Sequence, residues 1–124
     1  MSVPAVMAMH SPIELPSDHP AFAGHFPRFP VLPGAVLIDE ALQVIQRDRG
    51  IDLTRWQITS AKFLDIVRPG DALRVEHEAP RAGLIRFTIR AWDPTRAADG
   101  PIPGNDRTVV SGTLSSTVHP GGGA

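Results

Sequence analysis

A histidine, a carboxylate and a glutamine follow one another at close spacing in the first part of the chain, on either side of the dipeptide Pro33-Gly34. His25 carries the side chain whose unperturbed pKa lies nearest to neutrality, so it can accept a proton near pH 7. Asp39 and Gln43 are four residues apart, which makes them neighbours on one face of a helix. A histidine base, a carboxylic acid and an orienting amide are suited to removing a proton beside a carbonyl and expelling a hydroxyl from the adjacent carbon.

The backbone between these side chains offers a further group. If a helix begins at Gly34, the N–H groups of Gly34 and Ala35 lack helical partners, and with the helix dipole they can stabilise a developing oxyanion. Apolar neighbours on this helix would keep water from Asp39 and favour its proton-bearing form. Each residue taken alone also has a structural explanation, because a loop histidine is usually exposed and a helical aspartate often bonds to the backbone.

The elements that must position these groups follow from hydrophobic periodicity. Residues 34–49 predict the one convincing helix, buried around most of its circumference and ended by Gly50. Its apolar positions recur at helical spacing: Ala35, Leu37, Ile38, Ala41, Leu42, Val44 and Ile45. Residues 16–33 hold many of the 13 prolines and predict a loop. Prolines 27, 30 and 33 would stiffen the path between His25 and the helix.

The rest of the chain predicts strands. The expected strands are residues 13–15, 56–64, 72–79, 84–92 and 107–118, with a loop at 93–106. Alternation predicts buried faces carrying Leu73, Val75, His77 and Ala79, then Ile85, Phe87, Ile89 and Ala91, then Val110, Leu114 and Val118. We expect an α+β fold in which an antiparallel sheet wraps one central helix. On this view His77 is a packed histidine and not a second catalytic one.

Composition and net charge limit the classes of protein to which the chain could belong. The chain has 124 residues, a net charge of −1 and no cysteine, which predicts a single domain without disulfides or thiolate metal sites. We expect a core over about residues 5–118 and a flexible tail at 119–124. His10, His19 and His25 match no common metal-ligand spacing, so no metal is expected. The near-neutral charge does not favour nucleic acid, and no apolar run is long enough to span a membrane. With no signal-peptide pattern at the N-terminus, we expect a cytoplasmic protein.

Residues 24–43 closely resemble the hot-dog-fold 3-hydroxyacyl-acyl-carrier-protein dehydratases of the FabZ/FabA type. That family's pattern is G-H-F-x-x-x-P-(V/I)-x-P-G-x-x-x-x-(E/D)-A-x-x-Q, and the similarity continues over residues 61–71, which resemble K-x-x-F-x-x-x-V-x-P-G-D. The phrase at residues 19–34 also resembles a smaller branch, the short dehydratases of aryl-polyene and xanthomonadin-type pigment clusters. Glu40 stands where the family has alanine, but the spacing to His25 and Gln43 favours Asp39 as the acid.

The resemblance implies roles for particular residues. His25 would remove the C2 proton of a (3R)-3-hydroxyacyl thioester, Asp39 would protonate the leaving hydroxyl, and Gln43 would hold Asp39. The Gly34 N–H would polarise the thioester carbonyl. Substrate contacts are implied for Phe26, Phe29, Val31, Pro33 and Ala35, and Phe29, Leu37 and Phe63 would limit the depth of the acyl tunnel.

The resemblance also implies partners. The substrate arrives on the phosphopantetheine arm of acyl carrier protein, and no other cofactor is required. Two subunits would pair as a homodimer, with His25 of one chain facing Asp39 of the other; a higher oligomer or a heterodimer with a related dehydratase remains open. Arg28 would either meet the carrier or lie exposed. Two other functions remain open: a hot-dog acyl thioesterase, and a non-catalytic hot-dog partner subunit.

Overall fold

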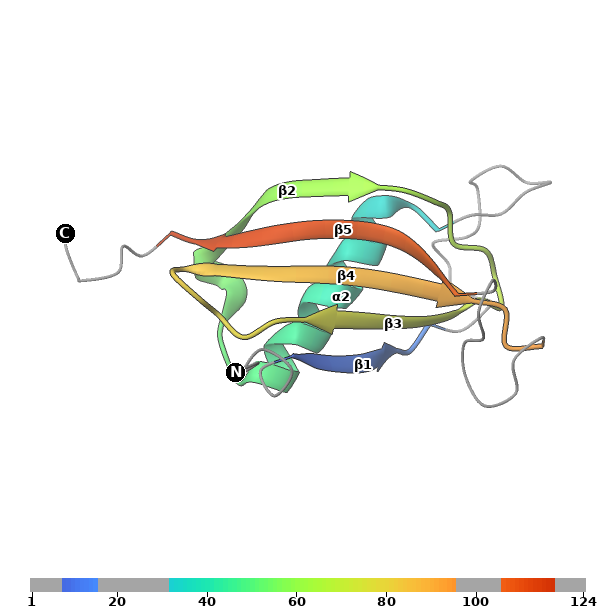
Figure 1. Ribbon diagram of the computed structural model, residues 1–124, viewed down its shortest axis with the longest axis horizontal. Helices are drawn as coiled ribbons and strands as arrows, with labels where there is room; N and C mark the ends of the chain where they lie inside the picture. Colours follow the sequence, from blue (N-terminus) through green and yellow to red (C-terminus); the bar gives the residue numbers. More distant parts are fainter. Residues whose placement is uncertain (1–7, 16–31, 96–105, 118–124) are drawn as a thin grey trace, which may run out of the picture.

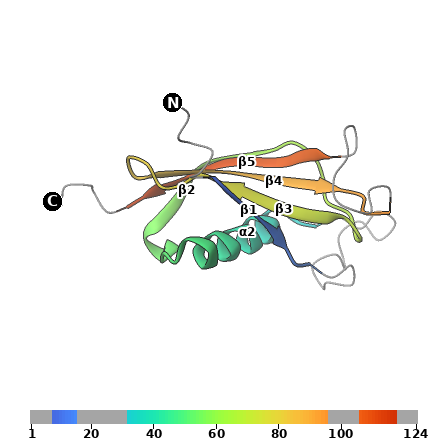
Figure 2. The same ribbon diagram turned by 60° about the horizontal axis from the view of Figure 1, so that its bottom comes forward.

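The computed structural model describes residues 8–15, 32–95 and 106–117, which form five strands and one long helix (Figure 1). In chain order these are β1 (Met9–Ile13), α2 (Gly34–Arg49), a 3₁₀ turn (Leu53–Arg55), β2 (Trp56–Phe63), β3 (Ala72–His77), β4 (Leu84–Trp92) and β5 (Arg107–Ser116). The strands form one antiparallel sheet in the order β1-β3-β4-β5-β2. Helix α2 lies against one face of this sheet (Figure 2). The expected α+β class, with one helix and an antiparallel sheet, is confirmed.

The buried faces of β3 and β4 follow the predicted alternation. Leu73, Val75 and His77 are buried on β3, as are Ile85, Phe87, Ile89 and Ala91 on β4. Strand β5 departs from alternation, because Val109 and Val110 are both fully buried. The register explains this: Ile89 pairs with Val110 but Arg90 pairs with Thr108, so Val109 is the extra residue of a bulge.

Helix α2 is buried on one side only, which corrects the expectation of burial around most of its circumference. Its buried residues are Leu37, Ile38, Ala41, Val44 and Ile45. Ala35, Asp39 and Gln43, spaced four apart, form an exposed row on another side. A single sheet covers only one face of a helix, and this row lies on a side of α2 that the sheet leaves exposed. No helix in the described ranges has the length and apolarity needed to cross a membrane.

The strand ends differ from the prediction by small amounts, except at the first strand. Strand β1 occupies Met9–Ile13, not residues 13–15, and pairs with β3 from Met9 opposite His77 to Ile13 opposite Leu73. Pro12 is tolerated there because β1 is an edge strand, where a missing N–H need not cost a ladder hydrogen bond. Strands β2, β3 and β5 end one or two residues before the predicted 64, 79 and 118.

Residues 64–71, here called the crossing segment, join β2 at one edge of the sheet to β3 near the other. The connection has to pass the ends of β5 and β4, beside the first turn of α2 (Figure 1). Val67 is buried, and its carbonyl accepts a hydrogen bond from the Leu32 N–H over 2.9 Å. The crossing segment is thereby fastened to the residue that leads into α2.

Candidate active site

The first turn of α2 has backbone donors that no described residue satisfies. Pro33 is the N-cap residue and provides no side-chain cap, while its carbonyl accepts from the Val36 and Leu37 N–H groups at 3.1 Å each. The Gly34 and Ala35 N–H groups have no partner among the described residues. Backbone donors at this positive end of the helix dipole are suited to binding a developing oxyanion.

Phe63 explains why a glycine opens the helix. A Cβ atom built on Gly34 would lie 2.5 Å from Cε1 and 2.9 Å from Cζ of Phe63. The aromatic ring therefore occupies the space that any other side chain at position 34 would need. This contact joins the end of β2 to the start of α2.

An open pocket of about 700 Å³ lies at this contact. Gly34, Ala35 and Ile38 of α2 line it together with Ile58 and Phe63 of β2 and with Asp65 to Val67 of the crossing segment. Apart from Asp65, the side chains that line it are apolar. A pocket of this size and character suits an acyl chain whose polar end meets the N–H groups of the helix.

A bulge in β2 brings Ile58 and Phe63 to the same face of the sheet. Ile58 pairs with Leu114 and Ser60 with Thr113, so Thr59 is an extra residue and the alternation changes phase there. Simple alternation places residues 58 and 63 on opposite faces, so no pattern in the sequence points to Ile58 as a pocket residue. Phe63, in contrast, is one of the residues that the resemblance implies would limit the depth of the acyl tunnel.

Asp39 and Gln43 are joined as predicted: the Gln43 amide Nε2 donates to Oδ2 of Asp39 over 3.0 Å. They continue the exposed row of α2 that begins at Ala35 in the pocket wall. The expectation that apolar helix neighbours shield Asp39 from water is wrong for the described chain, because this side of α2 is exposed. Glu40 is half-buried and does not belong to this row.

The structure places five of the predicted site residues on α2 or at its N-cap: Pro33, Gly34, Ala35, Asp39 and Gln43. His25, Phe26, Arg28, Phe29 and Val31 lie outside the described residues. Within ranges 8–15, 32–95 and 106–117, no three histidine, cysteine, aspartate or glutamate side chains form a group that could hold a metal ion.

His77 lies at the other end of α2 and is fully engaged in a buried hydrogen-bond network. Its Nε2 lies 3.0 Å from Oδ2 of Asp48, which also accepts a hydrogen bond from the Ser11 hydroxyl. Arg49 donates from Nε to His77 Nδ1 and from a terminal nitrogen to the His77 carbonyl, both over 3.0 Å. An accepting Nδ1 implies that the ring is neutral with its proton on Nε2.

The protonation of this network follows from its surroundings. Burial lowers the pKa of His77, with Arg49 acting in the same direction and the hydrogen bond to Asp48 opposing it. Partial burial raises the pKa of Asp48, but hydrogen bonds from Ser11 and His77 outweigh burial and leave it below its usual value. The prediction that His77 is a packed residue is confirmed, since it is 2% exposed.

Comparison with solved structures confirms the hot-dog fold. The dehydratase heterocomplex ApeI:P from Xenorhabdus doucetiae matches with a TM-score of 0.63 and 22% sequence identity, covering 92% of this chain and 90% of that one. At this level of identity the likeness establishes the fold alone.

Sequence comparison establishes the family. Residues 5–100 match the family described as ApeI-like, ApeI dehydratase, and the chain belongs to it. The 3-hydroxyacyl-acyl-carrier-protein dehydratase FabZ of Polynucleobacter asymbioticus is 36% identical over 83 residues, 60% of this chain and 56% of the relative. FabZ of Ruminiclostridium cellulolyticum is 30% identical over 96 residues, 69% of this chain and 68% of the relative. The chain thus spans little more than half the length of the Polynucleobacter protein.

Proposed function

We propose that this protein is a dehydratase that removes water from (3R)-3-hydroxyacyl thioesters on acyl carrier protein, giving trans-2-enoyl thioesters. The observation that carries the proposal is the Gln43–Asp39 hydrogen bond on the row of α2 that begins at the apolar pocket. Membership of the ApeI-like dehydratase family supports the same reaction. The protein would act in the cytoplasm, in fatty acid synthesis or in an aryl-polyene or polyketide-type pathway.

The proposed reaction begins at C2 of the substrate. His25 takes the C2 proton, and negative charge moves onto the thioester oxygen, where the Gly34 N–H donates a hydrogen bond. The C2–H electron pair then forms the C2–C3 double bond as the C3–O bond breaks. The departing hydroxyl takes a proton from Asp39 and leaves as water. Gln43 donates to Oδ2, which leaves Oδ1 of Asp39 to face the hydroxyl.

We propose further that a second subunit completes the site. Strand β2 is an edge of the sheet, and Ile58, Phe63 and Leu64 at this edge are 43%, 53% and 51% exposed. An exposed apolar edge strand favours pairing with another chain. A second subunit along β2 would cover the exposed row of α2 and bring its His25 to Asp39. We propose a homodimer, with a heterodimer with a related dehydratase as the other arrangement.

The oligomer is tested by native mass spectrometry of the purified protein at several concentrations. A homodimer is expected, together with loss of dimer when Ile58→Asp places a charge in the exposed apolar edge. Glu78→Gln is the matched control, because Glu78 is exposed on the connection after β3, away from β2. A monomer at all concentrations would disprove the homodimer and direct the search to a different subunit.

The reaction is tested by incubating the pure protein with 3-hydroxyacyl-carrier-protein substrates while enoyl formation and free thiol are followed separately. Enoyl product supports the proposal, free thiol indicates a thioesterase, and the absence of both indicates a binding subunit. His25→Ala is expected to abolish dehydration and keep the fold. His10→Ala is the matched control, because His10 is an exposed histidine on β1. Full activity in His25→Ala would exclude the proposed base.

A further inference from the structure

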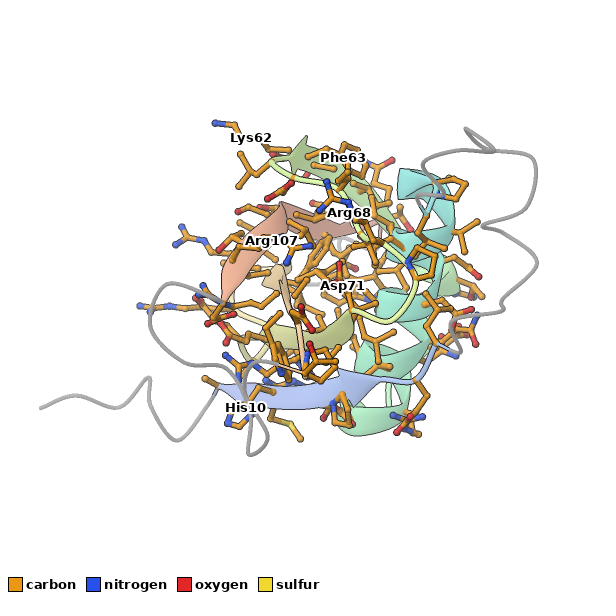
Figure 3. All side chains as sticks on the ribbon, turned by 90° about the vertical axis from the view of Figure 1, so that its right-hand side faces the viewer. His10, Lys62, Phe63, Arg68, Asp71 and Arg107 are labelled. Atoms are coloured by element: carbon orange, nitrogen blue, oxygen red, sulfur yellow. The ribbon has the colours of Figure 1, made fainter. Side chains whose placement is uncertain are left out.

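Arg107, the first residue of β5, bonds to both ends of the crossing segment. One of its terminal nitrogens donates to the Ile66 carbonyl over 3.0 Å and to Oδ2 of Asp71 over 2.7 Å. Its Nε lies 3.2 Å from Oδ2 of Asp65. In Figure 3, which looks at this end of the sheet, Arg107 and Asp71 lie together beside the crossing segment. One side chain therefore holds the segment where it leaves β2 and where it enters β3.

The register explains why Arg107 reaches this segment. Arg107 pairs with Ala91, which is buried against the helix side of the sheet, and cross-strand partners share a face. The guanidinium therefore lies on the helix side, at the end of the sheet that the segment passes. Several hydrogen bonds from one rigid guanidinium fix geometry better than a single ion pair on the surface.

Asp71 connects Arg107 by hydrogen bonds to the turn at Pro69 and Gly70. Its Oδ2, which accepts from Arg107, also accepts from the Arg68 N–H over 3.0 Å. The Asp71 N–H in turn donates to the Arg68 carbonyl over 3.1 Å. The side chain of Asp71 is only 12% exposed, so this carboxylate depends on Arg107 for its neutralising charge.

The segment that Arg107 holds is also a wall of the pocket. Asp65, Ile66 and Val67 line the pocket opposite the first turns of α2. The Val67 carbonyl accepts from the Leu32 N–H, two residues before Gly34. A shift of the crossing segment would therefore change both the width of the pocket and the position of the Gly34 N–H.

We propose that Arg107 is a positioning residue that sets the width of the acyl pocket and holds the start of α2 in register with it. This inference rests on the proposed function for its substrate. Arg107 touches no reacting atom in this scheme. It acts through the crossing segment, so its loss should alter which acyl groups are accepted as well as the rate.

Arg90 on β4 provides a matched control. Its Nε donates to both carboxylate oxygens of Asp106, at 3.2 Å and 3.1 Å, and its terminal nitrogens donate to Asp106 Oδ2 at 2.7 Å and to the Thr108 hydroxyl at 3.0 Å. Its neighbours Ile89 and Ala91 are buried, so Arg90 lies on the outer face of the sheet and bonds to none of the crossing segment. Arg90→Gln thus removes a comparable set of hydrogen bonds near the same end of the sheet without touching the pocket.

The first measurement needs no substrate. Amide hydrogen exchange is followed by mass spectrometry in wild type, Arg107→Gln and Arg90→Gln, over peptides covering residues 64–71 and 32–38. We expect about tenfold faster exchange in both peptides of Arg107→Gln and wild-type exchange there in Arg90→Gln. Unchanged exchange at 32–38 in Arg107→Gln, or equal acceleration in both variants, would overturn the inference.

The second measurement compares kcat and KM on 3-hydroxyacyl substrates of increasing acyl length. Arg107→Gln should lower kcat about ten- to a hundredfold and change the rank order of the substrates, since a displaced wall misaligns the bound thioester. Arg107→Lys should restore part of the rate, and Arg90→Gln should stay within about twofold of wild type. An unchanged rank order with a uniform fall in rate would contradict the positioning role.

The two measurements separate the two proposals. If the wild type forms no enoyl product, the proposed function fails while the exchange result still decides whether Arg107 holds the segment and the helix start together. If Arg107→Gln does not fold, Asp65→Asn removes one acceptor at an exposed position and leaves Asp71 paired. Asp65→Asn should then accelerate exchange at residues 64–67, and wild-type exchange there would overturn the inference.

Discussion

The two ends of α2 are built in opposite ways; we call the N-terminal end, beside the pocket, the open end and the C-terminal end, at Gly50, the closed end. At the N-terminal end the helix has no side-chain cap, borders an open apolar pocket and leaves Asp39 and Gln43 exposed. At the C-terminal end Gly50 closes the helix in the left-handed conformation, and Asp48 and Arg49 join a network with Ser11 and His77. Every buried side-chain nitrogen or oxygen in the described residues has a hydrogen-bond partner.

This difference separates the residues available for chemistry from those that hold the fold. The N-terminal end offers a substrate the Gly34 and Ala35 N–H groups, which have no partner among the described residues, and the exposed Asp39–Gln43 pair. The C-terminal end ties β1, α2 and β3 together through buried polar groups, which are costly to leave without partners. A histidine that serves as a base belongs near the open end, and a histidine that serves as a structural link belongs near the closed one.

The largest expected effect is on catalysis at the open end. Asp39→Asn should lower the rate of enoyl formation about 10²- to 10⁴-fold, because an amide cannot supply the proton that the departing hydroxyl needs. The free energy of unfolding of the single chain should change by less than about 0.5 kcal/mol, because the side chain is exposed there. Initial rates and urea unfolding of the same preparation measure both quantities.

Glu40→Gln is the control for Asp39→Asn, since Glu40 is the adjacent carboxylate outside the exposed row. It should keep a near-normal rate. If Glu40→Gln loses activity and Asp39→Asn retains it, the acid has been assigned to the wrong carboxylate.

Substitutions at the closed end should change the free energy of unfolding and not the rate. His77→Leu should lower the free energy of unfolding by about 2–4 kcal/mol, because it removes the two ring nitrogens of a buried residue that bond to Asp48 and Arg49. The rate per folded molecule should remain normal at temperatures well below the melting transition. Urea unfolding at about pH 7.5 measures the loss, and His10→Ala should change stability by less than about 0.5 kcal/mol. A catalytic defect in fully folded His77→Leu would contradict the assignment of His77 to stability alone.

Gly34→Ala tests the close contact at the open end. The new methyl group must displace the ring of Phe63, since its carbon would lie 2.5 Å from Cε1. We expect about a tenfold loss of rate as the pocket wall moves. Gly34→Ala combined with Phe63→Leu should recover part of that loss, because the smaller side chain leaves room for the methyl group. Kinetics of both single variants and the double variant measure the coupling, and simple additivity would show that Phe63 is not the obstacle.

Hydrophobic periodicity predicted α2 and strands β2 to β5 to within two residues, misplaced β1, and failed on side-chain burial where the register shifts. Strands β3 and β4 alternate regularly, and their buried residues were predicted correctly apart from Ala79, which lies beyond the end of β3. The bulges at Thr59 and Val109 change the phase of β2 and β5, and a sequence pattern carries no mark of an extra residue. This is why Ile58 was missed as a pocket residue and Val109 as a core residue.

Within the candidate site, contacts local to the helix could be predicted, and features that depend on the folded chain could not. The four-residue step from Asp39 to Gln43 is a local property of the helix, so their hydrogen bond could be predicted. The exposure of Asp39 depends on which side of α2 the sheet covers. Because apolar residues occur around most of the helix, the periodicity does not show which side that is. Arg107 is 36 residues from Asp71 and 41 from Ile66, and only the folded chain brings them together.

The smallest expected effect is the pH dependence of the closed end. Burial lowers the pKa of His77 below its ordinary value of 6.5, so below pH 6.5 the unfolded chain binds this proton more readily than the folded chain does. The stabilisation is therefore complete above pH 6.5 and is lost as the pH falls through the lower pKa of the folded state. Asp48 contributes separately, below its ordinary value of 3.8. The stability advantage of wild type over His77→Leu should shrink between about pH 7.5 and about pH 5.5, by no more than about 1.4 kcal/mol per pH unit. Other titrating groups are common to both proteins and largely cancel, so a constant difference over this range would mean that His77 protonates as readily in the folded chain as in the unfolded one.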